Sequence, residues 1–175
     1  MSTVLVVGDV MTDILVKPEG PIALGADRRA TIRLLPGGAG ANQACWLAHE
    51  GVNVRFVARV GQSELARQKA IFAGYGVDAR LGADDALPSG TLVTLLSPDG
   101  ERSFLTDRAA NLNLGRSDLP HSLLDGIDLL HVFRLRAVRG GAARRRAGPS
   151  CRGEASIHSL FGRPGVLLIS AGGRR

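Results

Sequence analysis

The chain has 175 residues, enough for one domain with a substantial core, and its apolar fraction of 45% fits a globular protein. No apolar run approaches the about 18 residues that a membrane-spanning helix needs, so we expect no membrane partner. The formal net charge of +6 suggests a nucleic-acid partner, but residues 1–132 carry a net charge of −3 and residues 133–175 carry +9. The basic character therefore belongs to the C-terminal segment alone, which argues against nucleic acid as a partner of the main body.

The opening residues MSTVLVVGD lead directly into an apolar run without a basic segment before it, so we expect no signal peptide. The two cysteines, Cys45 and Cys151, have neither zinc-site spacing nor the number needed for a disulfide framework. Both observations predict a reduced, cytoplasmic protein.

Short apolar runs alternate with helical patterns along residues 1–132. Strands are predicted at 4–8, 30–35, 52–61 and 126–132, and helices at 41–51, 63–76 and 118–126. Gly51 is expected to end the first helix, and Asp118 to be the N-cap of the last. Residues 90–107 predict two strands around the turn Ser97-Pro98-Asp99-Gly100. This alternation indicates an α/β domain with a mainly parallel sheet, and residues 14–35 and the hairpin are expected to form an antiparallel outgrowth.

Residues 133–175 break this pattern, because they are rich in Arg, Gly, Ala, Pro and Ser and contain only one candidate strand, VLLIS at 166–170. Three interpretations are open. The segment is a disordered basic tail that binds nucleic acid or an acidic partner, an atypical folded end of the domain, or the product of a shifted reading frame in a GC-rich gene.

A glycine-rich loop, with Gly37, Gly38 and Gly40 followed by Asn42, precedes the first predicted helix. A dinucleotide fingerprint would need its third glycine at Gln43, and the phosphate-loop pattern fails for lack of its second glycine and its lysine. One remaining interpretation is a sugar loop, in which backbone amides and the Asn42 carboxamide bind hydroxyl groups. The other is a simple helix N-terminal turn with Asn42 as its cap.

Two aspartates, Asp9 and Asp13, follow the first predicted strand, at the carboxyl end where open α/β sheets bind ligands. A carboxylate at this position can accept hydrogen bonds from two neighbouring sugar hydroxyls. Asp13 is therefore a candidate sugar ligand, with a turn or cap role as the alternative, whereas a local structural role is expected for Asp9.

These motifs resemble the N-terminal half of PfkB-type, or ribokinase-like, carbohydrate kinases. The resemblance covers about residues 3–132 and rests on VLVVGDVMTDILV, on PGGAGANQACWLAHEGVNVRFVARVG, and on GYGVDAR and SGTLVTLLSPDGERSFLTDRAAN. It implies a Rossmann-like α/β fold with a small antiparallel β lid, whose strands lie near 14–35 and 90–106. It also implies transfer of the γ-phosphoryl group of ATP to a sugar hydroxyl, and pairing into a homodimer through the lid.

The family resemblance implies a sugar-binding role for the aspartate after the first strand and for the glycine-rich loop. The corresponding positions here are Asp13, Gly37, Gly38, Ala39, Gly40, Ala41 and Asn42. Met11 and Ala39 stand where ribokinases carry Asn and Lys, so the resemblance does not specify ribose. Arg108 is expected either to contact an acidic sugar or to lie solvated at the lid.

The sequence departs from the family pattern in its last third. It contains no G-A-G-D motif, which holds the family's catalytic aspartate, so no catalytic residue is assigned. ATP and Mg²⁺ are expected for an intact member, but the segments that bind them are missing here. We therefore expect a truncated sugar kinase that is inactive as this chain. The alternatives are a non-catalytic sugar-binding module or pseudokinase, and a nucleic-acid-binding protein that acts through its basic tail.

Overall fold

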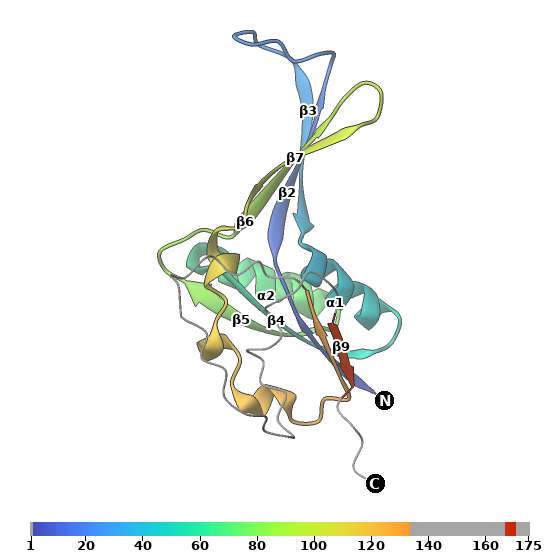
Figure 1. Cartoon of the computed structure of the whole chain (residues 1–175), viewed down its shortest axis with the longest axis vertical. Coiled ribbons are helices and arrows are strands. Elements are labelled where there is room, and N and C mark those ends of the chain that lie inside the picture. The colour runs from blue at the N-terminus through green and yellow to red at the C-terminus, as the bar shows by residue number, and fades with distance from the viewer. Residues whose placement is uncertain (1, 134–166, 171–175) are drawn as a thin grey trace, which may run out of the picture.

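A computed structural model describes residues 2–133 and 167–170 (Figure 1). A central sheet of five strands has the order β5-β4-β1-β8-β9. Strands β5, β4, β1 and β8 are parallel to their neighbours, and β9 runs antiparallel to β8. Their bounds are Thr3–Val7 for β1, Asn53–Gly61 for β4, Asp78–Asp84 for β5, Leu129–Val132 for β8 and Leu167–Ser170 for β9. The predicted α/β class with a mainly parallel sheet is confirmed, and β9 confirms the candidate strand VLLIS.

Two helices cover one face of the central sheet, α1 (Ala39–His49) and α2 (Leu65–Gly74), the second entered through the 3₁₀ turn η1 (Gln62–Glu64). Alternate residues of the strands face the helices, so Val6 and Phe56 pack with Phe72 of α2 in one apolar cluster. The other face is covered by 3₁₀ turns between β7 and β8. As predicted, Gly51 follows the end of α1 in the left-handed conformation, with φ 81°.

Four further strands form a second sheet, called the lid sheet below, which projects from the carboxyl end of the central strands (Figure 1). Its order is β3-β2-β6-β7, with bounds Met11–Pro18 for β2, Ala30–Gly37 for β3, Gly90–Leu96 for β6 and Arg102–Asp107 for β7. Each hairpin is antiparallel, as expected, while β2 and β6 join the two hairpins by parallel pairing. The turn at residues 97–100 is present, with Gly100 at φ 88°.

The helix predicted at 118–126 with Asp118 as N-cap is wrong. The chain there forms two 3₁₀ turns, η3 (Arg116–Asp118) and η4 (His121–Leu124). Asp118 ends η3, and its carboxylate accepts hydrogen bonds from the backbone of Gly115 and from Arg59. Long-range pairing with an arginine therefore determines its position. The strand β5 was also not predicted, because it lies at the sheet edge and its residues include several charged ones.

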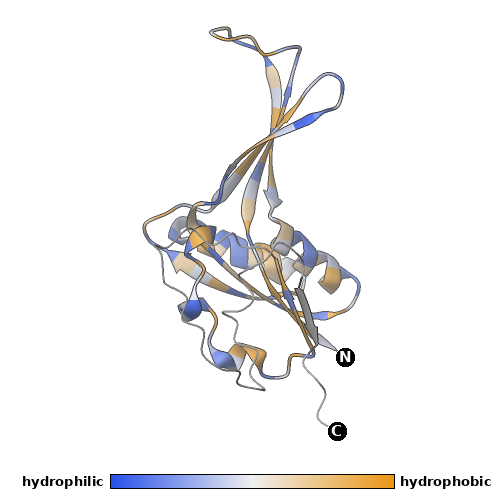
Figure 2. Cartoon of the chain, viewed as in Figure 1, coloured by the Kyte–Doolittle hydropathy of each residue, from blue (hydrophilic) through white to orange (hydrophobic). Residues whose placement is uncertain are grey.

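Hydropathy follows this architecture, since the central strands are apolar and apolar positions also recur along the lid strands (Figure 2). No helix in the described ranges is long and apolar enough to cross a membrane. Apart from Phe133 and strand β9, the C-terminal segment 133–175 lies outside the described residues, and so do the three interpretations of it.

Candidate functional site

The chain passes from the central sheet to the lid sheet at Gly8, Asp9 and Val10. Asp9 connects this segment to the start of α1 through two hydrogen bonds. Its Oδ1 accepts one from the backbone amide of Gly40 at 2.9 Å, and its carbonyl oxygen accepts one from the amide of Ala41 at 3.1 Å. These two bonds satisfy amide groups that the first turn of a helix leaves without partners. The local structural role predicted for Asp9 is confirmed.

The glycines of the loop are required by close approach of the backbone. Gly38 precedes α1 with φ 104°, and a Cβ there would lie 2.5 Å from the carbonyl oxygen of Asp9. A Cβ on Gly40 would lie 2.6 Å from the Cα of Gly8. A Cβ on Gly37 would overlap the carboxyl group of Asp13. The loop is thus held against β1 and β2 at a distance that admits no side chain.

Asp13 lies on β2 at the root of the lid sheet, with its carboxyl group against Gly37. Its Oδ1 is buried and accepts no hydrogen bond from any residue that the structure describes. Burial raises the pKa of this carboxyl above the ordinary range, and the nearby charge of Asp9 raises it further. The group is an acceptor without a donor, positioned where the two sheets meet.

Arg108 and Met11 lie at the same junction. The Arg108 Nη1 is 3.6 Å from Asp9 Oδ2, so the guanidinium is directed toward the loop, although its side chain remains 36% exposed. Met11 is 4% exposed, and its Sδ lies 3.4 Å from Nδ2 of Asn111. Met11 therefore packs beneath the junction and supports it.

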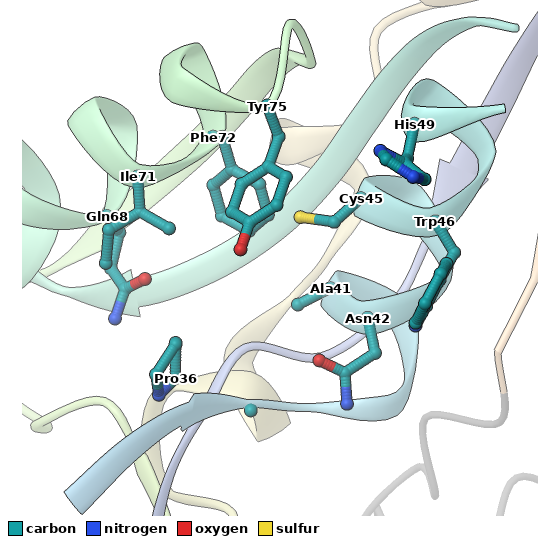
Figure 3. A pocket seen from close by; sticks show the side chains of 11 residues that line it. Pro36, Ala41, Asn42, Cys45, Trp46, His49, Gln68, Ile71, Phe72 and Tyr75 are labelled. Carbon is teal, nitrogen blue, oxygen red and sulfur yellow. The ribbon is translucent and has the colours of Figure 1, made fainter. Parts of the chain in front are cut away.

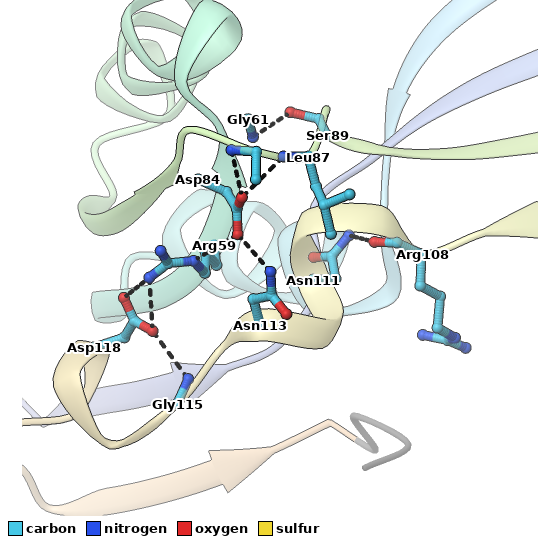
Figure 4. Close-up of polar contacts among 11 residues, drawn as sticks. Arg59, Gly61, Asp84, Leu87, Ser89, Arg108, Asn111, Asn113, Gly115 and Asp118 are labelled. Carbon is cyan, nitrogen blue, oxygen red and sulfur yellow. Dashed lines mark hydrogen bonds and ion pairs between the residues drawn. The ribbon is translucent and has the colours of Figure 1, made fainter. Parts of the chain in front are cut away.

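Asn111, which no local sequence pattern predicts, makes several hydrogen bonds at the junction, and Figure 4 shows the one to Arg108. It lies in the 3₁₀ turn η2 (Ala109–Asn113), is 2% exposed, and accepts a hydrogen bond from the Val10 amide at 3.0 Å. Its Nδ2 donates to the carbonyls of Val10 at 2.9 Å and Arg108 at 3.1 Å. A Cβ on Gly90, the first residue of β6, would overlap the same amide. One side chain thus joins the start of β2, the start of β6 and the exit from β7.

A second polar cluster fixes the approach to β6. The Asp84 carboxylate accepts hydrogen bonds from Arg59 Nε at 3.1 Å, from Asn113 at 2.8 Å and from the amide of Leu87 at 2.9 Å. These donors hold the pKa of the Asp84 carboxyl well below its usual range. Arg59 also pairs with Asp118 at 3.0 Å (Figure 4). The loop before β6 and the segment after β7 are therefore anchored to the central strand β4.

Asn42 and Ala39 lie on the exposed first turn of α1. The interpretation of Asn42 as the helix cap is wrong, because the N-cap is Gly38 and no side chain caps the helix. The Asn42 amide donates to the carbonyl of Gly38 at 2.9 Å, and its side chain lines a cavity between α1 and α2 (Figure 3). Of the predicted sugar-binding residues, the structure brings Asp13, Gly37, Gly38, Gly40, Met11 and Arg108 together around Asp9, with Ala39 and Asn42 beside them.

Within residues 2–133 and 167–170, no three His, Cys, Asp or Glu side chains come together as potential metal ligands.

Residues 1–137 match the family model described as pfkB family carbohydrate kinase. The aminoimidazole riboside kinase of Salmonella typhimurium is 33% identical over 126 residues, which are 69% of this chain and 36% of that enzyme. The chain thus spans about a third of the length of this curated relative.

Solved structures share the fold. Fructokinase from Xylella fastidiosa with bound ATP matches with a TM-score of 0.62 and 26% identity, over 75% of this chain and 41% of that one. Ribokinase from Cryptococcus neoformans var. grubii serotype A in complex with ADP matches with a TM-score of 0.56 and 27% identity, over 62% of this chain and 34% of that one. The ribokinase-like fold with its lid sheet is therefore shown, over a part of these longer chains.

Proposed function

Because the chain belongs to the pfkB family of carbohydrate kinases, we propose that it forms the half of a sugar-kinase site that holds the acceptor sugar. The observation that carries this proposal is the buried Oδ1 of Asp13, an acceptor without a described donor that lies against the side-chain-free backbone of Gly37. A vicinal diol supplies the hydroxyl donors that such a carboxylate lacks.

The glycine-rich loop complements Asp13 with donors. Asp9 occupies the amides of Gly40 and Ala41, so we assign to the sugar the amide of Ala39, which precedes them at the helix N-terminus. Gly37 and Gly38 let a ligand approach the backbone, and the exposed Asn42 carboxamide offers both a donor and an acceptor. The contact with Asp9 places Arg108 at the border of this site, and the positive charge of its guanidinium would favour a negatively charged sugar.

For the whole protein we propose phosphoryl transfer from ATP to a sugar hydroxyl, with Mg²⁺ as the accompanying cation. The fructokinase and ribokinase named above carry ATP and ADP respectively. In such a reaction the metal neutralises charge on the transferred phosphoryl group, and the rate depends on positioning and charge stabilisation. Because ATP is a cytoplasmic metabolite, we further propose a cytoplasmic location.

A second candidate function is sugar binding without catalysis. It is favoured by the glycine-rich loop, which is formed within residues 2–133. Phosphoryl transfer also needs a positioned nucleotide, so positioning of the sugar alone gives little of it. We propose that the chain by itself binds sugar and transfers phosphate slowly or not at all.

Calorimetry and a kinase assay separate these possibilities. The 175-residue chain is titrated with ribose, fructose, a purine riboside and a sugar acid, and heat from at least one of them is expected; heat from none would end the proposal. The same sugars are then incubated with ATP and Mg²⁺, and formation of sugar phosphate is measured. Product formation by this chain would exclude the non-catalytic module.

We also propose a homodimer formed through the lid sheet. The strand registers place seven aliphatic side chains on the face opposite Asp13: Ile14, Val16, Ile32, Leu34, Val93, Leu95 and Leu105. Leu34 and Leu105 are 66% and 61% exposed. This apolar face, which carries Asp107 at its root, fits a second copy of itself, since isologous pairing buries both faces.

Sedimentation equilibrium tests the dimer. We expect a dimer for the chain, a monomer for Leu34→Glu, and an unchanged dimer for Leu124→Glu, which alters an exposed leucine on η4. A monomeric parent chain would contradict the proposal. Nucleic-acid binding by the basic tail is tested separately by salt titration, since binding through phosphates weakens steeply with added salt.

A further inference from the structure

A cavity of about 310 Å³ lies between α1 and α2, on the helix-covered side of the central sheet (Figure 3). Residues on the facing sides of the two helices form its walls: Cys45, Trp46 and His49 come from α1, Gln68 and Phe72 come from α2, and Tyr75 follows the end of α2. Pro36 of the lid sheet closes one end. Asp13 does not line this cavity, and it lies on the face of the lid sheet opposite Pro36.

The lining of the cavity is rich in aromatic surface. None of its lining residues is Asp, Glu, Lys or Arg. Trp46 and Tyr75 are 67% and 54% exposed although both border a cavity, so large aromatic surfaces are open to a ligand. Burial raises the pKa of the Cys45 thiol, which keeps that group neutral as well. A neutral, flat, aromatic molecule matches this lining, because aromatic rings gain most from offset or edge contacts with one another.

Gln68 adds a specific polar group. Its side chain is almost completely buried, with the residue 2% exposed, and its carboxamide points across the cavity toward Pro36 (Figure 3). No hydrogen bond joins this carboxamide to another residue in the described part of the chain. The carboxamide faces the cavity, so a ligand there can pair with it. A carboxamide offers a donor and an acceptor side by side, as in its two-bond pairing with the N6 and N7 edge of adenine.

We infer that the α1–α2 cavity is a binding site for a neutral nitrogen heteroaromatic ring of the nucleobase class, with Gln68 pairing with the ring edge and Trp46 and Tyr75 contacting its faces. This site goes beyond the proposed sugar function and does not depend on it. The cavity shares Gly37 and Asn42 with the glycine-rich loop, so an occupant would lie next to the first turn of α1.

Trp46 is the single tryptophan of the chain and gives a direct readout. Its fluorescence, excited on the red edge to avoid absorption by the base, is titrated with adenine and, as a sugar control, with ribose. We expect a saturable change with adenine. In Gln68→Leu, which keeps the side-chain volume and removes the carboxamide, the adenine affinity should fall at least tenfold. Gln43→Leu is the matched control, because Gln43 is exposed on α1 and does not line the cavity.

A second readout uses Cys45 in a Cys151→Ser chain. Adenine is expected to slow alkylation of Cys45 by a small thiol reagent, and Gln68→Leu should remove this protection. Asp13→Asn should leave both readouts unchanged, which separates failure of this inference from failure of the proposed sugar function. The absence of a saturable signal with adenine, or equal affinity in Gln68→Leu and the parent chain, would overturn the inference.

Discussion

Gly40 and Gly8 are in direct backbone contact, since a Cβ on Gly40 would lie 2.6 Å from the Cα of Gly8. This contact presses the first turn of α1 onto the carboxyl end of β1, and it lets Asp9 accept from the Gly40 amide at 2.9 Å. The geometry of the glycine-rich loop therefore depends on the lack of a side chain at Gly8 and at Gly40 as much as it depends on Asp9.

Gly40→Ala should consequently destabilise the fold. The added methyl group must displace backbone, and overpacking of this kind costs about 1–3 kcal/mol. Denaturant unfolding measures the change. Gly74→Ala is the control, because a Cβ at Gly74 meets nothing within 4 Å and alanine is the better helix former by about 1 kcal/mol. Equal stability of Gly40→Ala and the parent chain would show that the loop is looser than described.

Asn111→Ala should loosen the attachment of the lid sheet. The substitution removes the partners of the Val10 amide and carbonyl in a buried environment, and each unsatisfied group costs about 1–3 kcal/mol. We expect a lower free energy of unfolding and faster amide exchange in β2 and β6. Asn53→Ala, at an exposed position of β4, is the control. Unchanged exchange in both lid strands would remove Asn111 from its assigned role.

Features of the fold that depend on residues close together in the chain could be predicted from the sequence, and most features that depend on distant partners could not. The stop at Gly51 and the turn at residues 97–100 depend on adjacent residues, and both are confirmed. The structural role of Asp9 is confirmed as well, although its partner Gly40 lies 31 positions away. Asn111 was not predicted because its partner Val10 lies 101 positions away. Asp118 was misassigned for the same reason, since Arg59, 59 positions away, takes its carboxylate.

Asp13 predicts a specific pH dependence of stability. Its pKa is raised in the folded state, so the folded chain binds its proton more tightly than the unfolded chain does. The stabilising contribution of the protonated form is then present at low pH, and it is lost as pH rises from the ordinary aspartate value of about 4 toward the raised folded value. Asp13→Asn should be more stable than the parent chain above this window. A parent and variant with the same pH profile of unfolding would contradict the assignment.

Arg59→Met should be strongly destabilising. The carboxylates of Asp84 and Asp118 would lose their shared cation, which leaves two charges without a partner in a partly buried environment. The matched substitution Arg80→Met breaks an exposed pair with Asp78 and should destabilise the fold much less, because solvent screens exposed pairs. Thermal unfolding of the two variants compares them, and equal losses would show that Arg59 does not anchor the segments around β6.

The central claim is that the carboxylate of Asp13 holds the acceptor sugar, and calorimetry of Asp13→Asn against the parent chain tests it most directly. For the sugar that binds the parent chain best, we expect affinity to increase as pH rises through the raised pKa of Asp13 and to fall at least tenfold in Asp13→Asn at neutral pH. Sugar binding of equal strength in Asp13→Asn, with the same pH dependence, would contradict the account.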